Sequence, residues 1–312
     1  MLIPLKVAEV KILGLLIKML SSTAEKTYWL SRYIERIENT SRLIIVNSDL
    51  LLDIPHDESD DLKHLIQITG HLNDFKKKNT KENVFYFLIQ DVKNPSSIKF
   101  SIEMAKMNSR YLLTMLPKSA WEQFNNLYLD FNSKNKPYSE DLYQIIRNSQ
   151  RFFAIISDGM QRNDVFNFIK LGRFIERADM LSRIIEDQIL RKENHVNKYY
   201  QNLQWSSVLR SVNGFESFKT INKDNLSQEV VLKFLIMEKL FPRSLKYCVE
   251  KLLEVQKYLP KSSLVKKDIS ILLEDFSNDD LFRNDKKMLK LLDNFQLGLI
   301  NVDKAINDRF FN

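Results

Sequence analysis

Two segments of the chain carry apolar or small side chains at the spacing of a helix with one buried face. In residues 30–44 and again in residues 171–185, such side chains recur three or four positions apart. Because a helix has 3.6 residues per turn, these positions form one continuous stripe. The stripes comprise Leu30, Ile34, Ile37, Ser41 and Ile44 in the first segment and Leu171, Ile175, Ala178, Ser182 and Ile185 in the second. We therefore predict one helix in each segment, with its stripe toward the core.

The two segments are also copies of each other. Eight of their fifteen positions are identical without a gap. A second pair of segments, 88–102 and 235–249, follows in the same order and shares five positions. The tetrapeptide Leu-Pro-Lys-Ser then follows in both halves, beginning at Leu116 and at Leu259. Three matches in the same order indicate an internal duplication.

The duplication organises the predicted fold. Six Gly and seven Pro residues among 312 leave few places for tight turns, which favours long helices over a sandwich or barrel. We expect an all-α helical bundle built from two diverged tandem repeats related by a pseudo-two-fold axis. The expected organisation is repeat A at about 20–120, a connection at 121–156, repeat B at about 160–265 and a helical tail at 270–312.

Four prolines in the repeated segments mark helix ends. Pro95 and Pro242 suit the first turn of a new helix, where the missing N–H costs nothing. Pro117 and Pro260 are expected to end these helices, because proline does not continue a helix.

The face opposite the apolar stripe carries the same charged residues in both copies. At 100° per residue, these side chains fall on the far side of each predicted helix. They are Arg32, Glu35, Arg36 and Arg42 in the first copy and Arg173, Glu176, Arg177 and Arg183 in the second. A solvated face needs no particular residues, yet these four are retained while their neighbours differ.

Three interpretations of this face are open. It is a solvated surface with weak ion pairs, a buried structural network in which Glu35 and Glu176 hold the arginines, or the lining of a cleft. In a cleft, six guanidinium groups would suit a carboxylate or phosphate ligand, which the planar fork binds bidentately. Glu35 and Glu176 are then the candidate general bases.

Composition restricts the remaining chemistry. The single cysteine, Cys248, excludes an intrachain disulfide, and no metal site, cofactor motif or nucleotide-binding loop is apparent. The net charge is +7, but the basic residues are scattered, so we do not expect a nucleic-acid partner.

The apolar run 12–17 is too short to cross a membrane, and we expect a cytoplasmic protein without membrane contact. Residues 1–18 are expected to be an extension ahead of the domain at 19–312, with Met19 as an alternative start.

Several short stretches form a recognisable set. They are Met19–Glu25, Tyr28–Arg36, Asp91–Ser97, Met160–Arg162, Leu171–Ala178, Leu209–Val212, Phe215-Glu216 and Phe241–Leu245. Taken together, they resemble the bacterial alpha-E domain family over about residues 19–265. The resemblance implies an all-helical domain without an assigned reaction. It also implies circularly permuted ATP-grasp proteins and transglutaminase-like proteins as partners, and hence a context of peptide or amide-bond modification.

Three functions follow from these observations. The first is a helical accessory or substrate-handling component that works with a circularly permuted ATP-grasp ligase and holds an anionic or peptide ligand. The second is an enzyme in its own right, which uses Glu35 or Glu176 in an Arg-rich cleft. The third is a non-catalytic scaffold with a buried Arg/Glu network. Whether the two glutamates meet at an open pocket or are sealed and paired would separate them.

Overall fold

Helices build all of the described structure. The computed structural model describes residues 4–53, 62–133, 139–191, 198–223, 225–259, 263–277 and 279–312. Within these ranges there is no β-strand. The predicted all-α fold is therefore confirmed.

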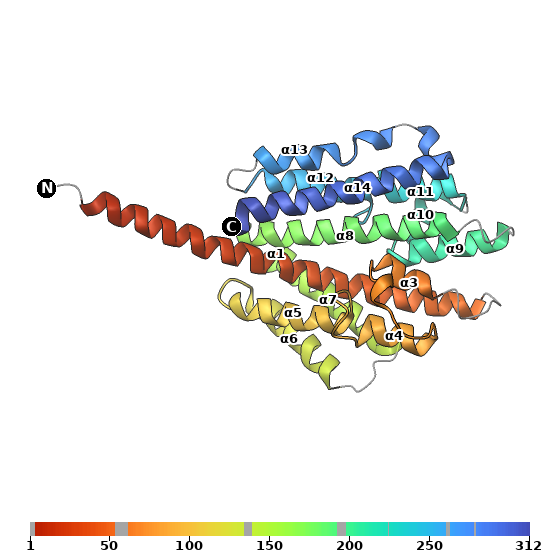
Figure 1. Ribbon diagram of the computed structural model, residues 1–312, viewed down its shortest axis with the longest axis horizontal. Coiled ribbons are helices and arrows are strands. Elements are labelled where there is room, and N and C mark those ends of the chain that lie inside the picture. The colour runs from red at the N-terminus through yellow and green to blue at the C-terminus, as the bar shows by residue number, and fades with distance from the viewer. Residues whose placement is uncertain are drawn as a thin grey trace.

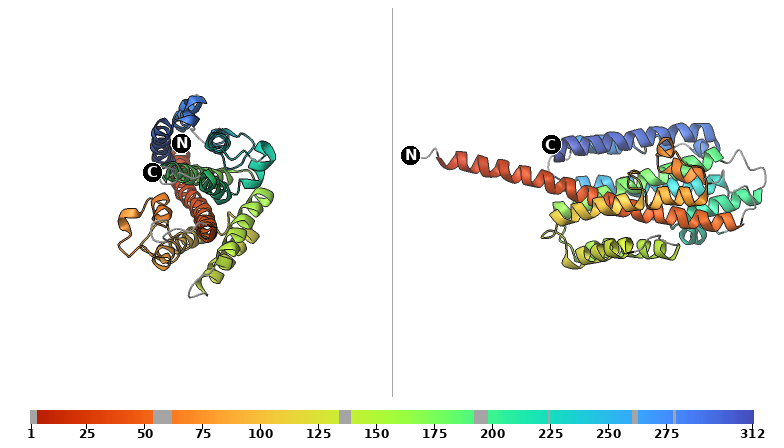
Figure 2. Two further views of the ribbon diagram at one scale, coloured as in Figure 1. Left: turned by 90° about the vertical axis from the view of Figure 1, so that its right-hand side faces the viewer. Right: turned by 60° about the horizontal axis from the view of Figure 1, so that its bottom comes forward.

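Two long helices, α1 (Pro4–Asp53) and α8 (Asp164–Arg191), form the centre of the bundle. They pack along each other, and the end-on view in Figure 2 shows the other helices arranged around them (Figures 1 and 2). Two helices flank α1, and two others flank α8. These are α5 (Ile98–Tyr111) and α7 (Ser139–Gly159) beside α1, and α12 (Leu245–Gln256) and α14 (Asp285–Ile306) beside α8.

Shorter helices complete each half. The first half adds α3 (Lys63–Ile68), the 3₁₀ helix η1 (Leu72–Asp74), α4 (Lys81–Ile89) and α6 (Lys118–Asn132). The second half adds α9 (Lys198–Ser211), α10 (Phe215–Asn222), α11 (Gln228–Met237), α13 (Ser263–Ile271), the 3₁₀ helices η3 (Glu274–Ser277) and η4 (Asp279–Arg283), and the π-helical turn η5 (Asn307–Phe311). The side chains of the expected extension at 1–18 lie outside the described residues.

Gly172 allows α1 and α8 to approach closely. A Cβ atom at this position would lie 2.3 Å from the backbone oxygen of Tyr28 and 2.2 Å from Oγ of Ser31. Both distances are far below van der Waals contact, so a side chain cannot be accommodated without separating the helices. Gly172 and Ser31 occupy the same position in the two repeated segments, and the central helices meet at this pair.

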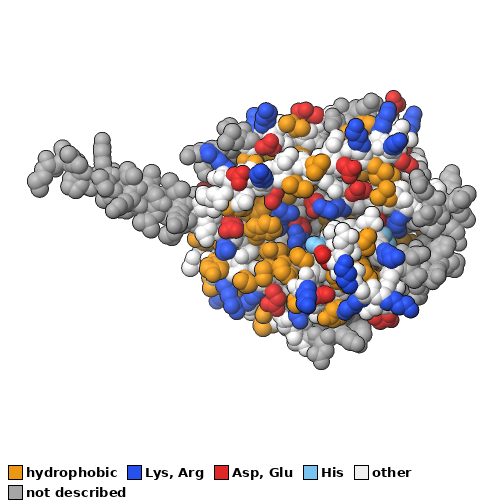
Figure 3. Space-filling model, in the orientation of Figure 1, with side chains coloured by type: hydrophobic (Ala, Val, Ile, Leu, Met, Phe, Trp, Pro, Cys, Tyr) orange, Lys and Arg blue, Asp and Glu red, His pale blue; other side chains and the backbone are white. Residues whose placement is uncertain are grey.

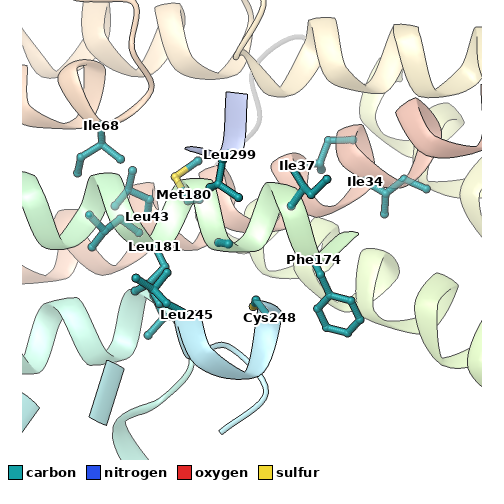
Figure 4. Packing of buried hydrophobic residues seen from close by; sticks show 14 of the residues in the cluster. Ile34, Ile37, Leu43, Ile68, Phe174, Met180, Leu181, Leu245, Cys248 and Leu299 are labelled. Carbon is teal, nitrogen blue, oxygen red and sulfur yellow. The ribbon is translucent and has the colours of Figure 1, made fainter. Parts of the chain in front are cut away.

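Both predicted apolar stripes are buried. Their ten residues are each 1% exposed or less. Figure 4 shows members of this core on α1 (Ile34, Ile37), α8 (Phe174, Leu181) and α12 (Leu245). Because α1 and α8 are surrounded by other helices, their charged faces are enclosed as well.

The predicted role of the prolines at the helix starts is wrong. α5 begins at Ile98 and α12 at Leu245, three residues after Pro95 and Pro242. The N-caps are Ser97 and Ser244, whose side-chain oxygens accept from the backbone N–H three residues on. At the other end, α5 stops at Tyr111, and Pro117 is the N-cap residue of α6. Pro260 lies outside the described residues.

Charges of both signs are mixed over the face of the molecule drawn in Figure 3. The seven excess positive charges therefore do not gather into one basic stripe on this face. In the part of the chain that the structure describes, every helix falls short of the length or apolar character needed to span a membrane.

Candidate functional site

Glu35 of α1 is surrounded by three arginines from the second half of the chain. Arg177 of α8 donates to both carboxylate oxygens, from Nε at 2.7 Å and from Nη2 at 3.0 Å. Arg173, one turn earlier, donates from Nε at 3.1 Å. Nη1 of Arg243, in the segment just before α12, lies 3.0 Å from Oε1. The carboxylate is thus held by guanidinium groups on two sides.

Glu176 of α8 is held in the same way by the first half. Arg32 donates from Nε to Oε2 at 2.8 Å, and Arg36 donates from Nε to Oε1 at 2.5 Å and from Nη2 to Oε2 at 3.0 Å. Each glutamate therefore pairs with the two arginines of the other copy and with none of its own. We call the four arginines and two glutamates the Arg/Glu core.

The Arg/Glu core also fixes the segments that precede α5 and α12. Nη1 of Arg36 donates to the carbonyl oxygen of Pro95 at 3.4 Å. Nη1 of Arg177 donates to the carbonyl oxygen of Pro242 at 3.1 Å. The two prolines thus lie at equivalent places, where each exposes a carbonyl that the central arginine binds.

Both glutamates are sealed from solvent and remain ionised. Glu35 is 0% exposed and Glu176 is 2% exposed. Burial alone would raise the pKa of Glu35, but Arg177, Arg243 and Arg173 hold it well below its ordinary value. Burial opposes ionisation of Glu176 too, and Arg36 and Arg32 lower its pKa below the ordinary value. A general base needs a pKa near the working pH and contact with the substrate, so this geometry favours the structural network for the two glutamates.

Arg42 and Arg183 do not join the Arg/Glu core. Each pairs instead with an acid one turn earlier in its own helix, Arg42 with Glu38 at 3.0 Å and Arg183 with Asp179 at 3.1 Å. Glu38 also accepts from Nη2 of Arg243 at 2.5 Å. The structure therefore gathers four of the six predicted arginines around the glutamates and adds Arg243.

Arg32 and Arg173 hold the same position in the two copies but have different surroundings. Nη1 of Arg32 donates to Oδ1 of Asp303 in α14 at 2.7 Å, and Tyr28 shares that carboxylate oxygen. Burial opposes the charge on Arg32, yet Tyr28, Glu176 and Asp303 together raise its pKa well above the ordinary value. The C-terminal helix thus supplies Arg32 with a second carboxylate.

Arg173 makes no ion pair with a second carboxylate in the described part of the chain. It donates to Glu35 from Nε, and its guanidinium carbon lies 3.8 Å from the ring centroid of Phe153. Burial and repulsion from Arg177 lower the pKa of Arg173 to about 10, although Glu35 and Glu38 oppose this shift. A side chain that stays 23% exposed with a poorly compensated charge is suited to bind an anion.

A pocket of about 670 Å³ opens beside Arg173, between α7, α8 and α12. Five cationic side chains line it: Arg162, Lys170, Arg173, Arg177 and Lys251. Glu254 is the one acid among the lining residues, and the aromatic side chains Phe166, Phe174, Tyr247 and Tyr258 form parts of the wall. Glu35 lies behind the pocket and is shared by Arg173 and Arg177, so positive charge remains in excess. We call this site the cationic pocket.

A second hollow, of about 540 Å³, lies toward the other end of α1 and contains Arg42. Its lining mixes Arg42 and Arg210 with the acids Asp49 and Glu216. Because the charges of this hollow balance, it suits a small anion less well than the cationic pocket does.

Sequence reasoning missed Arg243 and Asp303. The repeat comparison gave no signal for Arg243, because the first copy has Ser96 at the equivalent place after the proline. Asp303 lies in the segment interpreted as a tail, 271 positions from Arg32. Among the described residues, no group of three or more metal-ligating side chains is close enough to hold an ion.

Comparison with known proteins places the chain in one family. A family model described as a predicted alpha-helical domain with a conserved ER motif matches residues 19–311, which is nearly the whole chain. The Glu-Arg dipeptides at 35–36 and 176–177 fit that description and form the centre of the Arg/Glu core. No curated protein and no solved structure matches the chain significantly.

Proposed function

The chain belongs to the Alpha-E family, and we propose that it is a non-catalytic component that holds an anionic substrate for a system that forms or rearranges amide bonds. The proposed partner is a circularly permuted ATP-grasp ligase, with transglutaminase-like proteins in the same system. ATP-grasp enzymes join carboxylates to amines, so an anionic substrate is the chemistry that such an accessory would handle.

The cationic pocket is the observation that carries this proposal. Among the described residues, Arg173 pairs with an acid only through Nε, so its outer guanidinium nitrogens can bind a ligand. The planar fork of an arginine binds a carboxylate or phosphate through two parallel hydrogen bonds. The aromatic wall offers apolar contact to the rest of a ligand. Its volume of about 670 Å³ suits a short peptide or a similar small molecule.

The proposed fold behind this function consists of two diverged copies related by a pseudo-two-fold axis. The crossed pairing of Glu35 with Arg173 and Arg177, and of Glu176 with Arg32 and Arg36, supports this arrangement. The shared Pro95 and Pro242 contacts support it further. Superposing α1 and α5 on α8 and α12 should align the helices in the same order and direction; any other result would refute the two-fold relation.

The alternatives make different use of the Arg/Glu core. An enzyme with Glu35 or Glu176 as its base is disfavoured, because both carboxylates are paired and sealed. A pure scaffold would use the Arg/Glu core alone and would bind no ligand. The proposed component uses the Arg/Glu core to hold Arg173 and Arg177 at the edge of the cationic pocket.

The direct test is calorimetric titration of the full chain with two anionic probes, inorganic phosphate and the free acid of tri-alanine. We expect at least one probe to bind, with an affinity that falls as salt rises. Arg173→Gln should abolish this binding. The control Arg147→Gln, on the exposed side of α7, should not. Absence of binding by both probes at low salt would refute the substrate-holding function and leave the scaffold.

The partner is tested separately. The purified chain should associate with a circularly permuted ATP-grasp ligase from the same organism in size-exclusion chromatography and should raise that ligase's turnover of an anionic substrate. A ligase that neither associates with the chain nor responds to it would refute this part of the proposal.

A further inference from the structure

The C-terminal helix α14 carries its own carboxylate to the Arg/Glu core. Asp303 reaches Arg32 at 2.7 Å, and Tyr28 donates to the same oxygen. Phe311 of η5 packs against the Tyr28 ring at 5.5 Å between centroids, which encloses this end of the contact. At Arg32, therefore, a carboxylate from within the chain occupies the outer side of the guanidinium.

Helix α7 packs against α1, and α14 packs against α8. Under the proposed two-fold relation, α7 and α14 are equivalent helices. The register of the two helices can be read from their buried side chains. Five buried residues of α7 and the following turn each have a buried counterpart 146 positions later. These pairs are Leu142 and Met288, Ile146 and Leu292, Phe153 and Leu299, Ile156 and Val302, and Met160 and Ile306. The same offset places Asp303 opposite Ser157.

Ser157 and Arg173 both line the cationic pocket. The two sides of the bundle therefore differ in one respect that matters for binding. α14 provides a carboxylate to Arg32, whereas the aligned residue of α7 is the uncharged Ser157, which lines the same pocket as Arg173. Burial and repulsion from Arg177 lower the pKa of Arg173, whereas Tyr28, Glu176 and Asp303 outweigh burial and raise the pKa of Arg32.

We propose that the cationic pocket binds a carboxylate group of its ligand on Arg173, in the place that Asp303 takes on Arg32. This inference rests on the proposed substrate-holding function and names its ligand class. The ligand is a molecule with one free carboxylate and an apolar or peptide body, since the pocket is much larger than a carboxylate and has aromatic walls.

The carboxylate that already pairs with Arg32 inside the chain favours a carboxylate over a phosphate at Arg173. Glu254 lies among the lining residues and takes part of the charge of Lys170 and Lys251, at 3.8 and 2.5 Å. A planar carboxylate also matches the geometry that Arg32 and Asp303 adopt within the chain.

The first experiment introduces a carboxylate into the pocket by a substitution in the chain itself. Ser157→Asp should imitate Asp303, pair with Arg173, and weaken binding of tri-alanine free acid by about tenfold or more. It should also raise the melting temperature. The matched control, Ser157→Asn, has nearly the same size without the charge and should leave the dissociation constant within about threefold of the wild-type value.

A second measurement needs no substitution. Tri-alanine free acid should bind to the wild-type chain, whereas tri-alanine with an amidated C-terminus should bind about tenfold more weakly or not at all. Equal binding of acid and amide, or unchanged binding of the acid to Ser157→Asp, would overturn the inference.

The outcomes also separate this inference from the proposed function. If phosphate binds in an Arg173-dependent way and the free acid does not, the anion-holding function stands and the carboxylate assignment falls. If neither probe binds, the proposed function falls, and the inference falls with it.

Discussion

Replacing the two buried glutamates by glutamine tests the structural role of the Arg/Glu core. Glu176→Gln keeps the shape of the side chain and removes the charge that Arg32 and Arg36 share. Glu35→Gln does the same to Arg173, Arg177 and Arg243. Arginine does not lose its proton at accessible pH, so both changes leave buried guanidinium groups facing each other.

Both substitutions should lower the free energy of unfolding by a large amount. Removing one partner of a buried ion pair typically costs about 3–5 kcal/mol, because the remaining charge stays in a medium of low dielectric constant. Arg32 retains Asp303 after the Glu176 change, whereas the Glu35 change affects three arginines. We therefore expect Glu35→Gln to lie at or above the upper end of this range and Glu176→Gln nearer the lower end. With about 2.1 cal/mol/K of unfolding entropy per residue, a chain of 312 residues should melt roughly 5–8 °C lower.

Lowering the pH should reduce the difference in stability between the wild-type chain and each glutamine variant. The folded-state pKa of each glutamate lies below the unfolded value of 4.5. Such a group contributes stability above the unfolded pKa and loses it as pH falls through the folded pKa. The gap in melting temperature between wild type and each variant should therefore be full at pH 7 and shrink below about pH 4.

Thermal and urea unfolding, followed by circular dichroism, measure these effects. The matched control is Glu229→Gln, a carboxylate that also pairs with two cations, Lys233 and Arg283, but at the surface. This control should leave the melting temperature nearly unchanged, since exposed pairs contribute little. If Glu35→Gln and Glu176→Gln unfold like the Glu229 control at pH 7, the Arg/Glu core does not stabilise the fold and the reasoning is refuted.

Three further predictions follow from single contacts. Burial raises the pKa of Asp187 to about 6; because this exceeds the unfolded value of 3.8, its stabilising contribution is lost as pH rises through 6. Asp187 also pairs with Arg191 at 2.7 Å, so the prediction concerns the pH dependence: relative to wild type, Asp187→Asn should gain about 2–3 kcal/mol between pH 4 and pH 7.5, and a difference independent of pH would contradict the assignment. Gly172→Ala should cost about 3 kcal/mol, since its Cβ would meet the Tyr28 backbone. Gly159→Ala, with open space around it, should be neutral, and equal melting temperatures for the two would disprove the close approach. A chain that starts at Met19 should melt like the full chain, and a loss above about 2 kcal/mol would make residues 1–18 part of the core.

The repeated pattern predicted the centre of the molecule well. Two helices with buried stripes were expected from residues such as Ile34 and Ile175, and both residues are buried. The retention of the charged positions in both copies indicated that this face differs from ordinary surface. Periodicity could place the charges opposite the apolar stripe, and the enclosing helices explain why that face is buried too.

The pairing itself could not be predicted, because the partners lie far apart in the chain. Glu35 and Arg177 are 142 positions apart, and Arg32 and Asp303 are 271 positions apart. Arg243 and Asp303 have no counterpart of the same type in the other copy. A comparison of the two copies identifies only shared residues, so it could not identify these two. The prolines were assigned to helix starts by a general preference, whereas here their carbonyl groups bind arginines and serine provides the caps.

Guanidinium-detected NMR tests most directly whether ligand binding occurs at Arg173 rather than at the sealed centre. The full chain would be titrated with tri-alanine free acid, and the Arg173 signal identified by its loss in Arg173→Gln. The account predicts saturable shifts of the Arg173 Nε–H signal, with the Arg32 signal unchanged because Asp303 already occupies that side. Shifts of Arg32 in place of Arg173, or no shift of either, would contradict it.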